Sequence, residues 1–239
     1  CSGTMEWNGA TYAIPVQGND ETTDEIDGFV AGEEFTWMIW DVSEDIIWQA
    51  HATYIDEMPN AGEYMTNGIS AVSSITAIPP IIDQTIELLE GWNMISTYIT
   101  ADNMNVANLF SEVTEQLVIV KDNMGYAYLP DWGFNGIGDM IMGQGYQIKA
   151  HNLISWTIEG TYIDPENNPI SLYEGWNMFG YLRLEPANVI SVFEDIADDV
   201  VIVKDGNGFA YLPDWDFNGI GNLERGYGYL IKVSEEISN

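Results

Sequence analysis

A run of carboxylates near the start of the chain has side chains of the kind that bind calcium. Its members are Asp20, Glu21, Asp24, Glu25 and Asp27, followed directly by Gly28, which permits a tight reversal of the backbone. Calcium is held by about six to eight oxygens, so these carboxylates would need backbone carbonyls and water to complete a site. No complete calcium-loop pattern is present. The run therefore predicts either a calcium site, with calcium as the cofactor, or a solvated acidic loop.

The whole chain is strongly acidic, which narrows the choice of partners. It has 239 residues with 38 Asp and Glu against 6 Lys and Arg, a formal net charge of −32, and residues 1–120 contain no Lys or Arg. Such a surface repels nucleic acid and anionic lipid, so we expect neither as a partner. No run approaches the roughly 18 apolar residues that span a bilayer, so we expect no direct membrane insertion.

Four of the six cations recur in register along the chain. They are Lys121, Lys149, Lys204 and Lys232. One interpretation is a contact with an anionic partner. The other is an internal ion pair with carboxylates that recur beside them, such as Asp122 and Asp205. We favour ion pairs, because a lysine in so acidic a chain has carboxylates close by.

Aromatic residues recur in the same register and could stack on sugar rings or contact a partner. The residues that we single out are Trp132, Trp215, Tyr128 and Tyr211. Repeated aromatic residues more often fill a core. Exposure of several of them together would indicate a glycan-binding face.

No arrangement of residues indicates catalysis. His51 and His151 are the only histidines, and neither has a Cys or second His at metal-ligand spacing. The carboxylates Asp131 and Asp214 occupy equivalent places in two copies of one motif, so a turn or ion-pair role explains them better than glycoside hydrolysis. There is no nucleophile elbow and no phosphate-binding loop. We therefore expect a protein that is not an enzyme.

The chain contains a repeat that organises its second half. Residues 121–149 and 204–232 align without gaps, 83 residues apart, and 19 of the 29 positions are identical. Serial copies of one unit are typical of scaffold and surface proteins.

Hydrophobic periodicity predicts a mainly β fold with α+β repeats. We expect a β-sandwich-like domain at 1–80, N-terminally incomplete, then a small α+β repeat at 81–152, then a bridging strand and a second homologous repeat at 153–239. Pro79 and Pro80 suggest the first boundary. Short helices are expected near 104–116 and 187–197. Cys1 either begins a lipidated mature chain or marks a cut, and we favour the cut.

The repeated patterns resemble those of a known module. Gly-Trp-Asn-Met at 91–94 and 175–178, Val-Ile-Val-Lys-Asp at 118–122 and 201–205, and Gly-Tyr-x-Ile-Lys near 145–149 and 228–232 are similar to a repeat of large secreted Bacteroidetes surface proteins, substrates of type IX secretion. Residues 27–68 resemble the β-domain that commonly precedes it.

The resemblance implies an extracellular or cell-surface structural or adhesive segment. Its partners would be other copies or domains of the same surface assembly, in a surface polymer for example, and glycans are a second partner class. Two alternatives stay open, which are a carbohydrate-binding module and a phage virion structural protein that carries the same module.

Overall fold

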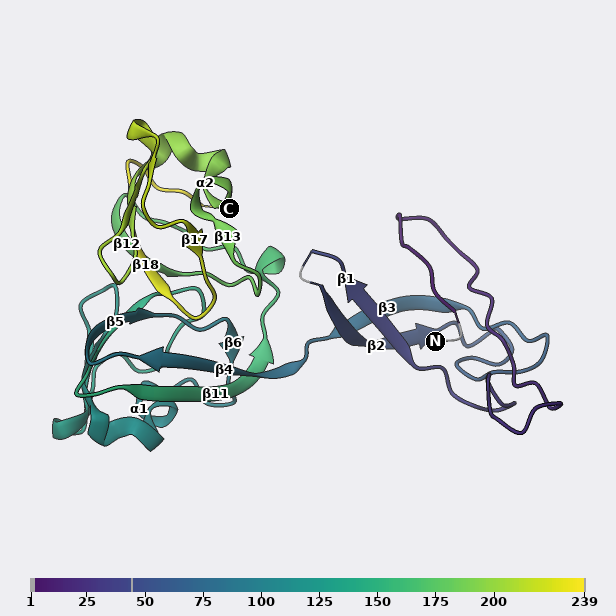
Figure 1. The fold of residues 1–239 in the computed structure, drawn as a ribbon. Helices are drawn as coiled ribbons and strands as arrows, with labels where there is room; N and C mark the ends of the chain where they lie inside the picture. The colour runs from purple at the N-terminus through teal and green to yellow at the C-terminus, as the bar shows by residue number, and fades with distance from the viewer. Residues whose placement is uncertain (1–2, 44, 239) are drawn as a thin grey trace. The chain divides into compact units, whose positions relative to one another are not determined.

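The computed structural model describes residues 3–43 and 45–238 and shows a mainly β protein. Strands account for 41% of the residues and helices for 12%, and the sheets are antiparallel. The chain divides into two compact units, Cys1–Ile78 and Pro79–Asn239 (Figure 1). The two repeats therefore lie in one unit.

The N-terminal unit is built on one sheet of three strands, β1 (Trp37–Asp41), β2 (Ile46–Tyr54) and β3 (Val72–Ile78), in the order β1-β2-β3. More buried and exposed residues alternate along β2, with Trp48 and Ala52 buried on one face. The long irregular segments of this unit are connected by two isolated β-bridges, which join Gly18 to Phe29 and Glu34 to Glu63.

The expectation of a β-sandwich is not met in this unit. A sandwich needs two packed sheets, whereas the residues described between 3 and 78 form a single sheet. Residues 11–16 form no ladder with a neighbouring strand, and Pro15 within them lacks the N–H that a ladder requires. The acidic run that follows consists of turns.

The C-terminal unit contains two five-stranded sheets with the same order of elements. The sheet of the first repeat has the order β5 (Gly91–Ile95), β10 (Tyr146–Ala150), β7 (Leu117–Lys121), β8 (Ala127–Leu129) and β9 (Phe134–Asn135). The sheet of the second repeat has the order β12 (Gly175–Gly180), β18 (Gly228–Val233), β14 (Val200–Lys204), β15 (Ala210–Leu212) and β16 (Phe217–Asn218).

Each repeat has one short helical segment where the sequence predicts a helix. The first has α1 (Val106–Leu109) and the 3₁₀ helix η1 (Ser111–Gln116), and the second has α2 (Val189–Val192) and η4 (Glu194–Asp199). An asparagine caps each α-helix, because the Asn105 side chain accepts from Ala107 N and the Asn188 side chain accepts from Ile190 N.

Short elements complete the unit. They are β6 (Ile99–Thr100), β13 (Ala187–Asn188), β17 (Asn222–Leu223), and the 3₁₀ turns η2 (Pro130–Trp132), η3 (Pro165–Asn167) and η5 (Pro213–Trp215). Strands β13 and β17 pair with each other.

Strand β11 (Ile154–Tyr162), which the sequence places with the second repeat, pairs instead with elements of the first. Its partners are β4 (Ile81–Leu88) and β6, in a third sheet with the order β4-β11-β6. Trp156 on β11 is buried, stacks on Phe110 with ring centroids 4.3 Å apart, and donates from Nε1 to Leu109 O. The bridging strand thus closes the core of the first repeat.

The two repeats meet through equivalent edges. Ile95 at the end of β5 forms a β-bridge with Tyr227 of the second repeat. The equivalent residues form the reciprocal bridge, between Phe179 and Gln144. The contact is close, because a Cβ added at Gly228 would lie only 2.5 Å from Ile95 O.

Backbone hydrogen bonds repeat the same exchange across the interface. Ser96 N donates to Gly226 O at 2.9 Å, and the equivalent Gly180 N donates to Gly143 O at 2.9 Å. The edge strands β5 and β12 therefore each contact the loop that leads into the last strand of the other repeat.

Candidate functional site

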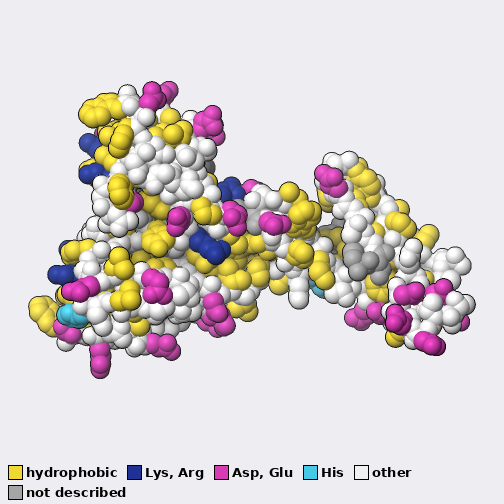
Figure 2. All heavy atoms as spheres, in the orientation of Figure 1, with side chains coloured by type: hydrophobic (Ala, Val, Ile, Leu, Met, Phe, Trp, Pro, Cys, Tyr) yellow, Lys and Arg dark blue, Asp and Glu magenta, His cyan; other side chains and the backbone are white. Residues whose placement is uncertain are grey.

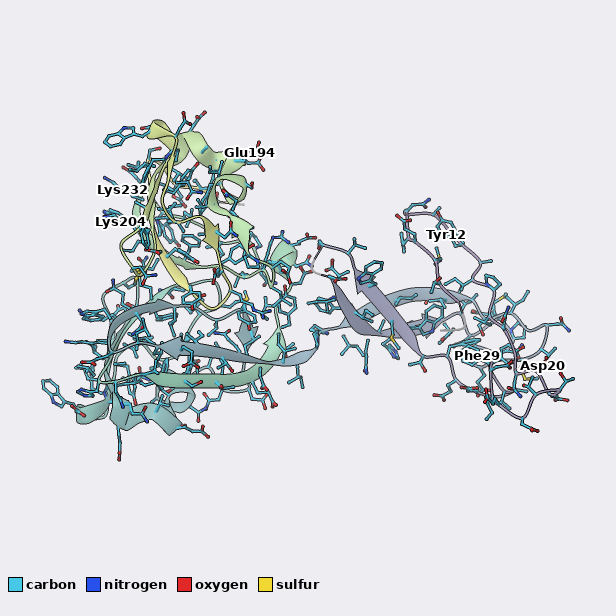
Figure 3. All side chains as sticks on the ribbon, viewed as in Figure 1. Tyr12, Asp20, Phe29, Glu194, Lys204 and Lys232 are labelled. Carbon is cyan, nitrogen blue, oxygen red and sulfur yellow. The ribbon has the colours of Figure 1, made fainter. Side chains whose placement is uncertain are left out.

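The acidic run in the N-terminal unit is organised by local hydrogen bonds. Asp20 Oδ1 accepts from Thr22 Oγ1 at 2.7 Å and from Thr22 N at 2.9 Å, and Asp20 N donates to Asp27 Oδ1 at 2.9 Å. The hydroxyl and then the backbone N–H of Thr22 lower the pKa of Asp20. Figure 3 shows Asp20 in a loop of this unit.

The structure does not gather the five carboxylates of this run around one point. Among residues 3–43 and 45–238, no group of three or more His, Cys, Asp or Glu side chains is close enough to share a metal ion. A calcium site would need these side chains to rearrange, so calcium binding stays a prediction.

Three of the four repeated lysines lie near the face of a tryptophan ring. Lys121 Nζ is 5.2 Å and Lys149 Nζ is 5.9 Å from the ring centroid of Trp92, and Lys204 Nζ is 5.6 Å from that of Trp176. Strand register accounts for one of these contacts, since Lys149 is the cross-strand partner of Trp92. Lys121 and Lys204 reach the rings from strands β7 and β14, where their cross-strand partners on the last strand of each repeat are Gln147 and Leu230.

The second repeat has the same arrangement with one cation fewer over its ring. Lys232 is the cross-strand partner of Trp176, and it projects with Lys204 from the same sheet (Figure 3). Three of the four lysines make cation–π contacts, and the ion pairs expected for the four lysines stay a prediction. Figure 2 shows the visible lysine and arginine side chains on the unit formed by residues 79–239, as the sequence requires.

The four singled-out aromatic residues fall into two classes. Trp132 and Trp215 are 82% and 77% exposed, whereas Tyr128 and Tyr211 are each only 4% exposed. The tyrosines lie at the centres of β8 and β15 and point into the core. Each tryptophan ends a 3₁₀ turn that begins with proline. The sequence pattern alone does not separate the two classes.

A phenylalanine accompanies each exposed tryptophan. Phe134 and Phe217 are 52% and 51% exposed and lie two residues after Trp132 and Trp215. We call Trp132 with Phe134, and Trp215 with Phe217, the aromatic tips of the two repeats. The phenylalanines were not predicted as site residues, although their identical register in the two copies was a signal for them.

A cleft of about 470 Å³ lies where the repeats meet. Its walls come from β4 and β5 of the first repeat and from residues 205–209 and 219–229 of the second. Aromatic and acidic side chains line it together with backbone of β5. The half-buried Asp205 is one of them, and the exposed ones include Trp92, Phe209, Tyr227, Glu87 and Glu224. Sequence reasoning missed the cleft, because it exists only once the two repeats have docked.

The two histidines lie in different units. His51 lines a cavity of about 300 Å³ in the N-terminal unit with Trp37 and Tyr54, and His151 directly follows β10 in the other unit. Asp131 and Asp214 lie within the equivalent 3₁₀ turns η2 and η5.

In comparisons with known proteins, no family model, no curated protein and no solved structure matches this chain. The resemblance to the secreted Bacteroidetes module therefore stays a prediction that rests on its motifs. Within the described residues, no helix is long and apolar enough to cross a membrane.

Proposed function

We propose that this chain is a non-enzymatic adhesive segment of a larger extracellular or cell-surface repeat protein, and that the aromatic tips are its points of contact. The observation that carries the proposal is the exposure of Trp132 and Trp215 at equivalent ends of the two repeats. Water disfavours large exposed apolar side chains by about 25 cal/mol for each Å² that remains uncovered. A partner that covers the indole and the adjacent phenyl ring recovers that free energy.

Two equivalent tips in one unit favour a multivalent contact. Binding of one tip raises the effective concentration of the partner near the other, so weak individual contacts add up to firm attachment. The partners that fit are other copies or domains of the same surface assembly, because a repeated tip requires a repeated receptor. The strongly negative charge keeps the segment in solution until such contacts form.

The test is self-association of the purified chain, measured by sedimentation velocity over a wide range of protein concentration. We expect wild-type protein to associate at high concentration and the Trp132→Ala, Trp215→Ala double variant to remain monomeric. Each single variant should be intermediate. Tyr173→Ala is the matched control, because Tyr173 is an exposed aromatic residue of the same unit outside the tips. A wild-type chain that stays monomeric, or a double variant that associates equally well, contradicts the proposal.

A second candidate, a carbohydrate-binding module, is favoured by the same exposed indoles. Tryptophan rings at a surface can stack on the apolar faces of sugar rings, in addition to pairing with protein side chains. A glycan array with the same variants separates the two candidates. Glycan binding that the double tip variant loses would support the second candidate.

A further inference from the structure

The two halves of the interface between the repeats differ in one side chain. We call the half in which Asn123 contacts β12 the closed half, and the half that holds the cleft the open half. In the closed half, Met178 on the edge strand β12 donates its backbone N–H to Asn123 Oδ1 at 3.0 Å, and Asn123 comes from the first repeat. Gly145 N donates to Met178 O at 3.1 Å in the same place. A carboxamide side chain thus fills this half and satisfies an edge-strand N–H.

In the open half, the residue equivalent to Asn123 is Gly206, which has no side chain. The residue equivalent to Met178 is Met94 on β5. Backbone N–H groups of alternate residues point to the same side of a strand, and Ser96 N donates across the interface to the second repeat. Met94 N–H therefore faces the second repeat as well. A Cβ at position 206 would lie 3.4 Å from Met94 N, so Gly206 is placed where Asn123 is in the other half.

The lining of the cleft also differs from the equivalent surface of the closed half. The cleft contains Tyr227 and Glu224, whereas the first repeat has Gln144 and Ile141 at these positions. At these two positions, an aromatic ring and a carboxylate occur in the second repeat only. A volume of about 470 Å³ is within the range of small-ligand sites.

We propose that this cleft binds a neutral N-acetylated sugar, with its acetamido carbonyl accepting from Met94 N–H. The closed half supplies the template, because Asn123 presents the same carboxamide group to the equivalent N–H. The exposed rings of Phe209 and Tyr227 stack on the apolar face of the sugar.

The charges of the cleft determine which sugars it accepts. The carboxylates of Glu87 and Glu224 accept hydrogen bonds from sugar hydroxyls. The same carboxylates repel sugars that carry an acidic group, and Asp205 adds to this repulsion. This site is separate from the aromatic tips and does not depend on the proposed function.

The test is isothermal titration calorimetry of the full chain with the trimer of N-acetylglucosamine and, as a matched ligand, the trimer of glucose. We expect the acetamido trimer to bind at least about tenfold more tightly, because only this trimer has a carbonyl that can accept from Met94 N–H as Asn123 Oδ1 accepts from Met178 N–H. A tenfold difference in affinity corresponds to about one well-formed hydrogen bond. Equal affinities for the two trimers, or no binding of the acetamido trimer, overturn the proposal.

The decisive variant is Gly206→Asn, which places in the cleft the same side chain that Asn123 places in the closed half. We expect it to lose acetamido-sugar binding by at least about tenfold while its melting temperature stays at or above that of the wild type. The melting temperature shows that the variant is folded. Unchanged binding by a folded Gly206→Asn variant overturns the proposal.

The tip variant separates this site from the proposed function. The Trp132→Ala, Trp215→Ala double variant should bind the acetamido trimer as the wild type does. If it loses that binding, the sugar is held at the tips and the cleft proposal is wrong. Failure of self-association alone would leave the cleft unaffected.

Discussion

The two repeats share a sheet order but complete their cores with different aromatic pairs. In the first, Phe110 beside the helical segment stacks on Trp156 of β11. In the second, the equivalent Phe193 meets Phe179 edge to face, with ring centroids 5.7 Å apart. Phe179 is on the repeat's own edge strand, where the first repeat has Ile95. In both repeats an aromatic ring packs against the phenylalanine of the helical segment, but β11 provides that ring in the first repeat and β12 provides it in the second.

The largest effect should come from removing the ring that only the first repeat has. Trp156→Ala removes a side chain that is 2% exposed and leaves Leu109 O without its indole donor. We expect a loss of about 3–5 kcal/mol in the free energy of unfolding. Chemical denaturation followed by tryptophan fluorescence measures it. Trp132→Ala is the control, because the same substitution at an exposed site should change stability by less than about 1 kcal/mol. Similar losses in the two variants would contradict the assignment of β11 to the first core.

A second prediction concerns a feature in which the repeats agree. Tyr146 and Tyr229 occupy equivalent positions, and burial raises the pKa of each to about 12 from the ordinary 10.0. Each hydroxyl also accepts a backbone N–H, from Ile141 and Glu224 respectively, which partly opposes that rise. In the unfolded chain both tyrosines ionise near pH 10, so the unfolded state loses its protons first. Their contribution to stability is therefore complete below pH 10 and declines as the pH rises toward 12.

Melting temperatures recorded from pH 9 to pH 12 check this prediction. We expect the decline to be shared by the two repeats, so the Tyr146→Phe and Tyr229→Phe variants should each show a shallower decline than the wild type. A steeper decline in either variant would show that other groups control the alkaline transition.

The smallest effect should distinguish the two tryptophan–lysine contacts. Trp92 has two lysine ammoniums near its ring face, whereas Trp176 has one within 6 Å. Lys204→Met should therefore remove the whole cation–π contribution at its ring, about 0.5–1 kcal/mol, whereas Lys121→Met leaves Lys149 in place and should cost less. Denaturation midpoints of the two variants measure the difference. Equal midpoints would mean that the second cation over Trp92 adds nothing.

Features that depend on local sequence could be predicted, and features that depend on docking could not. The two short helical segments and the equivalence of the repeats both follow from neighbouring residues. The pairing of β11 with β4 joins segments about 70 residues apart, and no local pattern specifies which repeat it completes. A sandwich was expected for residues 1–80 because their sequence patterns predict strands. Such patterns do not show whether the strands form one sheet or two.

The candidate site divides in the same way. Recurrence in register identified the exposed Trp132 and Trp215, but it also identified Tyr128 and Tyr211, which the core takes up. The lysines were expected to pair with carboxylates because acidic residues are abundant, whereas the strand register places Lys149 opposite Trp92 and Lys232 opposite Trp176. The cleft forms only when the two repeats are docked, so the sequence alone did not indicate that Gly206 lines a site.

The exchange of contacts between the repeats has the form of a homodimer contained in one polypeptide. When residue i of one copy meets residue j of the other and j meets i, the interface is that of a two-fold symmetric pair of subunits. In a true homodimer one gene encodes both subunits, so an asparagine that fills one half of the interface must also be present in the other half. Joining the copies in a single chain lets each inherit its own mutations. Asn123 can then lock one side of the interface while Gly206 leaves the other side free to evolve as a receptor.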